Sequence, residues 1–201
     1  FDSGVLNAEN KDVVVIGGGD TAMDCLRTAV RQNAKSVTCL YRRDKANMPG
    51  SQREVQNAEE EGVNFQWLSA PHALLGDGSV RSVRARRIHL GQPDETGRQV
   101  PQIIENSDFD VDADLVIKAL GFDPEDVPAM FGQPELGVSK WGTVKIDWKT
   151  MMTSAPGVFA AGDIVRGASL VVWGIRDGRD AAEQMDKYIQ AEQRGEIRAA
   201  E

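Results

Sequence analysis

The sequence contains little cysteine. Cys25 and Cys39 are its two cysteines, and they are too far apart to form a C-x-x-C pair. This spacing excludes a catalytic dithiol and a cysteine-ligated iron–sulfur cluster within this chain. Free, buried thiols are typical of a reducing compartment, so we expect a cytoplasmic protein.

Long apolar runs and an excess of positive charge are also absent. No stretch approaches the length of a membrane span, and the N-terminus has no signal-peptide pattern. The net charge of -8 argues against nucleic acid and anionic membrane surfaces as partners. With 201 residues, the chain can form one large or two small domains. It begins with Phe1 rather than Met, which indicates a fragment or a trimmed chain.

One stretch near the N-terminus organises the rest of the chain. Val13–Ile16 is a run of β-branched apolar residues and predicts a strand buried on both faces, as in a parallel sheet. Gly17, Gly18 and Gly19 follow, and a helical pattern then extends to about residue 32. This is the strand–turn–helix of a dinucleotide-binding βαβ unit. A plain strand–helix turn is the alternative.

The spacing Gly17-x-Gly19-x-x-Ala22 gives each residue a physical role. Gly17 permits the tight turn, Gly19 lets a pyrophosphate approach the backbone, and Ala22 keeps the helix close to the strand. The positive helix end then faces the anion. Asp20 is expected to be the helix N-cap, and Thr21 is the expected phosphate contact.

The end of the second strand indicates which nicotinamide cofactor is bound. Ser36–Tyr41 predicts this strand, and the preceding Asn33 is expected to end the helix in a left-handed conformation. An NAD-binding fold usually has an acidic residue here, for the ribose 2′-hydroxyl. This chain instead has Arg42 and Arg43, which favour the 2′-phosphate of NADPH. The alternative is a solvated basic pair partly neutralised by Asp44.

The next segments complete one mononucleotide-binding half. Ser51–Glu54 has the pattern of a capping box, and the helix that it opens is expected to end at Gly62. Val63–Leu68 predicts the third strand. The order so far is β-α-β-α-β, as in a dinucleotide-binding domain.

An antiparallel meander is expected in the middle of the chain. Gly76–Gly78 and Gln92–Gly97 predict turns on either side of strand-like segments in 79–90, and the alternation after them ends in the strand Leu115–Leu120. Gly121 follows that strand, where a ligand can approach the backbone, although a simple turn is an equal alternative. Four arginines suggest an anion site, but exposed strand positions explain them better. They are Arg81, Arg84, Arg86 and Arg87.

The last part of the chain carries a second candidate site. Thr143–Asp147 predicts a short strand, and 153–163 predicts a turn and a buried strand that ends at Gly162 and Asp163. Such an aspartate can bond a polyol hydroxyl, although it can also be a simple turn residue. A helix follows, because apolar or small residues recur at alternating four- and three-residue steps. These are Val171, Ile175, Gly178, Ala182, Met185 and Ile189.

In combination, these motifs resemble the small (beta) subunit of NADPH-dependent glutamate synthase and the wider group of two-dinucleotide flavoprotein reductases. The likeness extends from about Lys11 to Ile189. The matching segments are 17–25, Tyr41–Asp44, Met48–Ser51, Glu59–Val63, Gly157–Gly167 and Ser169–Val172.

The resemblance implies a role for each candidate residue. NADPH would be held by Gly17, Gly19, Thr21, Ala22, Arg42 and Arg43. FAD would touch Gly162 and Asp163, and the helix start at Ser169 and Leu170 would face the flavin ring. No catalytic acid or base and no metal ligand is expected, because the cofactors carry the hydride chemistry.

One departure from the family pattern bears on domain organisation. The chain has one dinucleotide loop instead of two and lacks the family's cysteine-rich N-terminal region, so we expect a C-terminal fragment whose parent protein holds the iron–sulfur clusters and the first half of the FAD domain. The expected partner is the glutamate synthase large subunit. The expected divisions are a linker over 1–12, an NADPH-binding domain over 13–149, the C-terminal part of an FAD domain over 150–190 and a charged tail over 191–201.

The predicted fold class is therefore α/β. It comprises a Rossmann-like three-layer domain with an inserted antiparallel β-meander, and a C-terminal strand–helix remnant of an FAD domain. The implied function is transfer of hydride from NADPH to FAD and of electrons to a glutamate-forming subunit. Two alternatives stay open: a sister reductase, such as the flavoprotein part of dihydropyrimidine dehydrogenase or a ferredoxin:NADP oxidoreductase subunit, and a nucleotide-binding fragment with no catalysis of its own.

Overall fold

The chain forms two compact units, which we describe separately. The computed structural model describes residues 6–93, 97 and 99–196. Unit 1 comprises Phe1–Gly121 and unit 2 comprises Phe122–Glu201. Among the described residues, no helix combines the length and the apolar character needed to cross a membrane.

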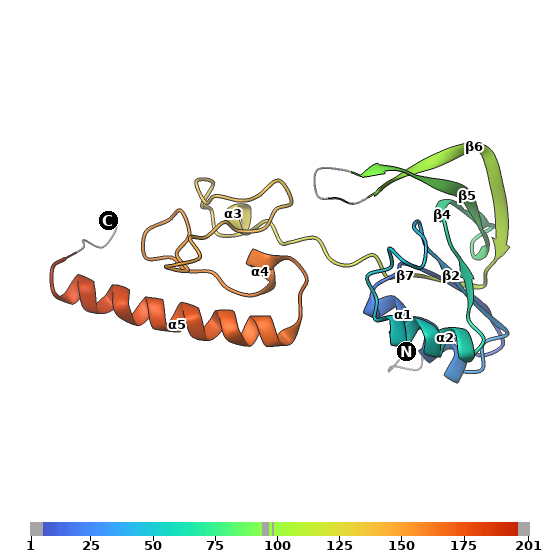
Figure 1. The fold of residues 1–201 in the computed structure, drawn as a ribbon, viewed down its shortest axis with the longest axis horizontal. Coiled ribbons are helices and arrows are strands. Elements are labelled where there is room, and N and C mark those ends of the chain that lie inside the picture. Colours follow the sequence, from blue (N-terminus) through green and yellow to red (C-terminus); the bar gives the residue numbers. More distant parts are fainter. Residues whose placement is uncertain (1–5, 94–96, 98, 197–201) are drawn as a thin grey trace. The chain divides into compact units, whose positions relative to one another are not determined.

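Unit 1 is built around a four-stranded parallel sheet in the order β3-β2-β1-β7. Helices α1 and α2 cover one face of the sheet (Figure 1), and their apolar residues pack against alternate residues of the central strands. The elements are β1 (Asp12–Ile16), α1 (Asp20–Arg31), β2 (Ser36–Leu40), α2 (Gln52–Glu60), β3 (Asn64–Gln66) and β7 (Leu115–Lys118).

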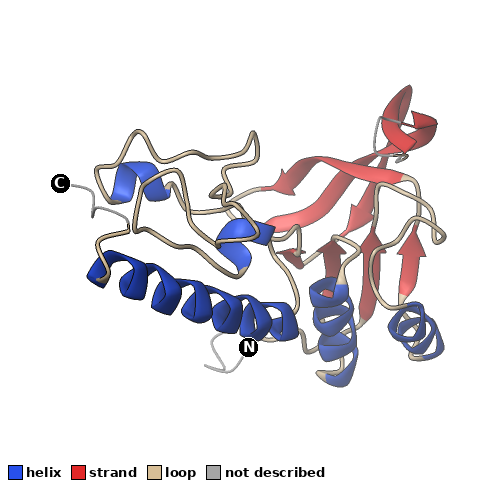
Figure 2. Cartoon of the chain, turned by 60° about the vertical axis from the view of Figure 1, so that its left-hand side comes forward, coloured by secondary structure: helices blue, strands red, loops and turns tan. Residues whose placement is uncertain are grey.

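A three-stranded antiparallel sheet covers the other face of the parallel sheet, away from α1 and α2 (Figure 2). Its strand order is β4-β5-β6. Its strands are β4 (Ser69–Gly76), β5 (Val80–Pro93) and β6 (Gln99–Asp112). Val83 and Ala85 of β5 are fully buried against Val14 and Leu40 of the parallel sheet. The run of apolar residues in β1 is therefore explained, because both faces of this strand are covered.

The predicted fold class of this unit is confirmed, and most elements lie where the sequence places them. Asn33 has the expected left-handed conformation, with φ 58°. The capping box is wrong: Ser51 is the N-cap of α2, but its side chain makes no capping bond. Glu54 instead forms an ion pair with Arg27 of α1. Part of the predicted turn Gln92–Gly97 lies outside the described residues.

Unit 2 contains the helices α3 (Val127–Met130), α4 (Asp163–Arg166) and α5 (Val171–Gln193). Two predicted strands are wrong. In place of the strand at 143–147 there is an isolated pairing of Val138 with Val144, and in place of the buried strand before Gly162 an isolated pairing of Met152 with Phe159. A strand needs a continuous neighbouring backbone, and these segments meet none over more than one residue pair.

Helix α5 begins at the predicted residue, and the apolar stripe that predicted the helix lies mostly on its exposed face within unit 2. Val171, Ile175 and Ile189 of the apolar stripe are exposed, whereas Asp177 and Ala181 are the buried residues of the helix. The stripe was predicted from periodicity alone, which shows that one face is apolar and does not show what lies against it. The face that packs within unit 2 is instead set by an ion pair of Asp177, described below.

The boundary between the units differs from the expected division at 149/150. Residues 122–149 pair with later parts of unit 2: Val144 N–H donates to Ile164 O at 2.8 Å, and Gly137 N–H donates to Ser154 Oγ at 2.8 Å. These bonds explain why this segment belongs to unit 2. The assignment of NADPH to one part of the chain and FAD to the other stays a prediction.

Candidate dinucleotide-binding site

In the turn between β1 and α1, Gly17 has no space for a side chain. This residue has φ +144°, and a Cβ at its position would lie 2.2 Å from the carbonyl oxygen of Ala119, just after β7. Gly17 N–H donates to Leu40 O at 3.2 Å, and Cys39 Sγ donates to Gly17 O at 3.3 Å. Gly17 thus lets three neighbouring strands converge at the carboxyl edge of the sheet.

An aromatic ring occupies the space that a side chain at Gly18 would need. A Cβ at Gly18 would lie 2.4 Å from a carbon of the Tyr41 ring, whose hydroxyl donates to Asn47 O at 3.1 Å. The carbonyl of Gly18 accepts a hydrogen bond from Gly50 N–H at 3.0 Å. The sequence did not predict that Tyr41 and Gly50 support the turn, although both lie in segments that carry the family resemblance.

Gly19 differs from Gly17 and Gly18 because a side chain at its position would have free space around it. No heavy atom lies within 4 Å of a Cβ built at this position, apart from the adjacent residues. Gly19 is the N-cap of α1 and carries no side chain to satisfy the amides of the first turn. Thr21 is exposed, and Ala22 is fully buried against the sheet, as its predicted role requires. The open side of the turn is therefore also the positive end of a twelve-residue helix.

The predicted capping role of Asp20 is wrong. Asp20 is already the first helical residue, and its Oδ1 accepts a hydrogen bond from Ser51 N–H at 2.9 Å. An N-cap must precede the helix with an extended backbone, and Gly19 has that backbone, with φ -88° and ψ 179°. Asp20 thus joins the loop before α2 to the turn and leaves the helix amides uncapped by a carboxylate.

Arg42 and Arg43 lie directly after β2, at the same edge of the sheet. Arg42 is exposed, whereas Arg43 is half-buried and its Nε is a buried nitrogen without a hydrogen-bond partner among the described residues. Asp44 Oδ1 accepts bonds from the backbone and side-chain nitrogens of Asn47, each at 2.8 Å. An unsatisfied guanidinium nitrogen is unfavourable unless an acceptor arrives, which suits an anionic ligand.

The residues of unit 1 therefore fit a dinucleotide. Gly19 offers open space at a helix N-terminus, and Arg43 offers an unpaired donor at the end of the neighbouring strand. Gly121 has φ +90° and is open, so the last residue of unit 1 also leaves its backbone accessible.

The candidate flavin residues lie on consecutive elements of unit 2. Gly162 is the N-cap of α4 with φ 77° and ψ -149°, and Asp163 is the first residue of that helix and is exposed. Ser169 is exposed, and Leu170 is the N-cap of α5. A Cβ at Gly162 would meet no atom within 4 Å. These residues fit a group that approaches an open backbone turn and has a hydroxyl that donates a hydrogen bond to a carboxylate.

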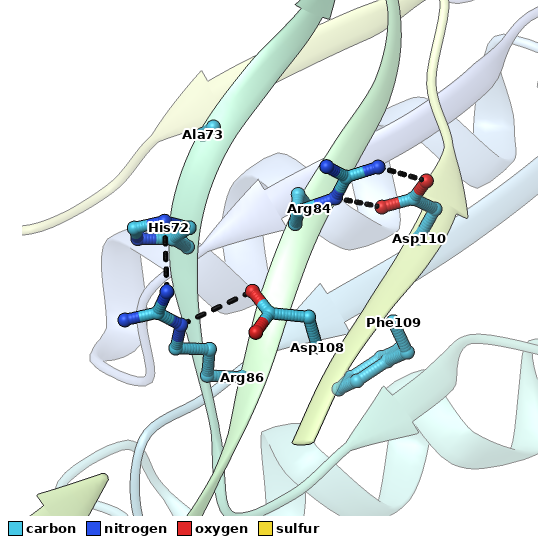
Figure 3. Close-up of a pocket in the computed structure, with 7 residues that line it drawn as sticks. All are labelled: His72, Ala73, Arg84, Arg86, Asp108, Phe109 and Asp110. Atoms are coloured by element: carbon cyan, nitrogen blue, oxygen red, sulfur yellow. Dashed lines mark hydrogen bonds and ion pairs between the residues drawn. The ribbon is translucent and has the colours of Figure 1, made fainter. Parts of the chain in front are cut away.

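Two of the four arginines, Arg84 and Arg86, line a recess of about 710 Å³ on the solvent face of the antiparallel sheet (Figure 3). Arg84 pairs with Asp110 through two bonds of 2.8 and 2.9 Å, and Arg86 Nε donates to Asp108 at 3.1 Å. Each guanidinium is thus neutralised by an aspartate of β6. Such cross-strand pairs agree with the prediction of surface arginines in strands and offer an anion little free charge.

Cys39 gives a chemical test of how closely the turn is packed. Burial raises the pKa of the Cys39 thiol to about 12, so at pH 8 only about one molecule in ten thousand carries the reactive thiolate. We expect a disulfide reagent at pH 8 to modify the half-buried Cys25 in the folded chain and to modify Cys39 only after denaturation. Mass spectrometry of the labelled peptides measures this, and rapid labelling of Cys39 in folded protein would contradict the packing of the turn.

Comparisons with known proteins agree with this architecture. The family model described as pyridine nucleotide-disulphide oxidoreductase matches residues 2–195. Glutamate synthase [NADPH] small chain of Azospirillum brasilense is 64% identical over 200 residues, which cover 100% of this chain and 42% of that protein. Putative oxidoreductase AegA of Escherichia coli is 49% identical over 189 residues, 92% of this chain and 28% of that protein.

A solved structure also matches. The thioredoxin reductase of Lactococcus lactis superposes with a TM-score of 0.70 at 27% identity, over 90% of this chain and 54% of that chain. The chain spans less than half the length of the curated relatives named above. The family match over nearly every residue, together with the turn geometry, settles the assignment: the chain belongs to the pyridine nucleotide-disulphide oxidoreductase family.

Proposed function

We propose that this chain is the NADPH-binding part, and the C-terminal part of the FAD site, of a glutamate synthase small subunit. The observation that carries the proposal is the open space beside Gly19 at the N-terminus of α1. The 64% identity to a protein named as such a small chain supports the choice within the family.

The chain's own residues have distinct tasks in this proposal. The first-turn amides of α1 bind the pyrophosphate of NADPH, and Gly19 keeps a side chain out of its way. Arg42 and Arg43 bind the 2′-phosphate. Asp163 accepts a hydrogen bond from a hydroxyl of the FAD polyol chain. The N-terminus of α5 at Leu170 stabilises the electron-rich flavin carbonyl. NADPH supplies a hydride and FAD accepts it, while the protein supplies binding and orientation.

In the longer protein, the electrons pass through iron–sulfur clusters held outside this chain to a large subunit that forms glutamate from 2-oxoglutarate and glutamine. A cytoplasmic location agrees with the two free thiols. The test is an assay of the full-length polypeptide with a glutamate synthase large subunit. We expect NADPH oxidation that requires both 2-oxoglutarate and glutamine, and oxidation without this requirement would contradict the proposal.

A second candidate is a sister reductase with another electron acceptor, of the dihydropyrimidine dehydrogenase or ferredoxin:NADP oxidoreductase type. It is favoured by the 49% identity to a protein whose name gives no glutamate synthase activity. The same assay separates the two, because a sister reductase oxidises NADPH with an artificial acceptor and does not respond to the large subunit.

The arginine pair predicts a preference for NADPH over NADH. Isothermal titration of the chain is expected to show at least roughly tenfold tighter binding of NADPH, since a charge-assisted bond to the 2′-phosphate contributes about 1.5–3 kcal/mol. The Arg43→Gln variant should lose most of this preference and keep its affinity for NADH. Arg81→Gln, which removes an exposed arginine of β5, is the control. Equal affinities of the unmodified chain for both nucleotides would contradict the 2′-phosphate assignment.

A further inference from the structure

Asp177 is a buried acidic residue in the middle of α5. It is 2% exposed, although its neighbours in the helix are mostly exposed. Arg166, the last residue of α4, donates from Nε at 2.5 Å and from Nη2 at 2.8 Å to the two carboxylate oxygens. The Gly162 backbone N–H also donates to this carboxylate. The Arg166 guanidinium holds the pKa of the Asp177 carboxyl below its usual range, so the pair is ionised.

The bonds to Asp177 fix both ends of α4, a helix that is not stable on its own. Helix α4 has four residues, which is too short for a stable helix without outside contacts. Its N-cap Gly162, with φ 77° and ψ -149°, is in a region that essentially only glycine adopts and that persists where surrounding contacts impose it. Asp177 supplies such contacts at both places, through the N–H of Gly162 and the guanidinium of Arg166.

Arg166 also joins α4 to two aromatic side chains. Its guanidinium carbon lies 4.8 Å from the centre of the Trp148 ring and 4.9 Å from that of Trp173. Trp173 is in the first turn of α5, next to the N-cap Leu170. Arg166 therefore ties the orientation of α4 to the N-terminus of α5 through a planar guanidinium that contacts both rings and pairs with Asp177, whereas Lys lacks the planar fork.

We infer that Arg166 and Asp177 are a positioning pair, which fixes the Gly162–Asp163 turn relative to the N-terminus of α5 and thereby aligns the two elements that contact FAD. The inference rests on the proposed function, because that function assigns both elements to the flavin. A buried ion pair adds little net stability compared with an apolar pair of the same shape. The three directed bonds to Asp177 are better explained by the geometry that they impose.

The test uses the full-length polypeptide that contains this chain, carrying Asp177→Asn. The substitution keeps the size of the side chain and removes the charge that binds Arg166. Flavin fluorescence titration is expected to show FAD binding weakened about ten- to a hundredfold, the range typical for loss of an outer partner of a ligand-binding group. The visible circular dichroism per bound flavin should change at saturating FAD, and NADPH affinity should not. Asp186→Asn, at an exposed position of the same helix, should leave all three unchanged.

Several outcomes would overturn the inference. An Asp177→Asn protein with unaltered FAD affinity and unaltered dichroism per bound flavin would show that the pair does not position the site. If that variant does not fold, Arg166→Lys gives the decisive measurement, because it keeps the charge and removes the planar fork; wild-type flavin dichroism in this variant would equally contradict the inference. If the unmodified polypeptide binds NADPH but no FAD, the proposed FAD site fails and the inference fails with it.

Discussion

The Gly19→Val variant is expected to lose NADPH binding and to keep the fold of unit 1. Gly19 has φ -88° and ψ 179°, an extended backbone that valine adopts easily, and no heavy atom lies within 4 Å of its added Cβ. The new Cβ therefore has free space around it, and we expect the valine side chain to extend into the space assigned to the pyrophosphate. We expect affinity to fall by at least about a hundredfold, which corresponds to about 2.7 kcal/mol.

Isothermal titration with NADPH measures this effect, and far-UV circular dichroism reports whether the fold is retained. Gly178→Val is the matched control, since this glycine of α5 also has no atom within 4 Å of an added Cβ. A folded Gly19→Val protein that binds NADPH with unchanged affinity would refute the assignment of the turn, and with it the context for the arginine pair.

The first strand–turn–helix could be predicted from the sequence because its determinants are local. The apolar run Val13–Ile16, the glycines and the helical period that starts at Asp20 are adjacent in the chain. The supports of the turn are not adjacent. The Tyr41 ring beside Gly18 and the Gly50 N–H on the carbonyl of Gly18 are brought there by β2 and the loop after it. Their roles depend on tertiary packing, which periodicity and spacing do not describe.

The errors in unit 2 have a related cause. The apolar segment before Gly162 has the composition of a buried strand, yet Val158 is 47% exposed and the segment pairs at a single position. Composition predicts which backbone could join a sheet, and a strand forms only where another strand lies beside it. Asp177 was overlooked because a charged residue between apolar stripe positions is usually solvated, whereas here Arg166 satisfies it.

A second large effect is expected for Gly17→Ala, this time on stability. A Cβ at Gly17 would lie 2.2 Å from the backbone oxygen of Ala119, and at φ +144° an L-residue is strained as well. Neither β1 nor β7 can move aside without breaking the ladder that joins Val13–Ile16 to Leu115–Lys118. Overpacking and backbone strain together should lower the free energy of unfolding of unit 1 by about 3 kcal/mol or more.

Gly62→Ala separates the two contributions to this effect. Gly62 also has a positive φ, +94°, but no atom lies within 4 Å of its added Cβ, so this variant carries the backbone strain without the clash. Its expected cost is about 1–2 kcal/mol. Urea unfolding followed by circular dichroism compares the two variants. Equal losses of stability would mean that the backbone at Ala119, after β7, moves away from the added Cβ without cost. The carboxyl edge of the sheet would then be too flexible to keep the Gly17–Gly19 turn in the shape that a pyrophosphate needs.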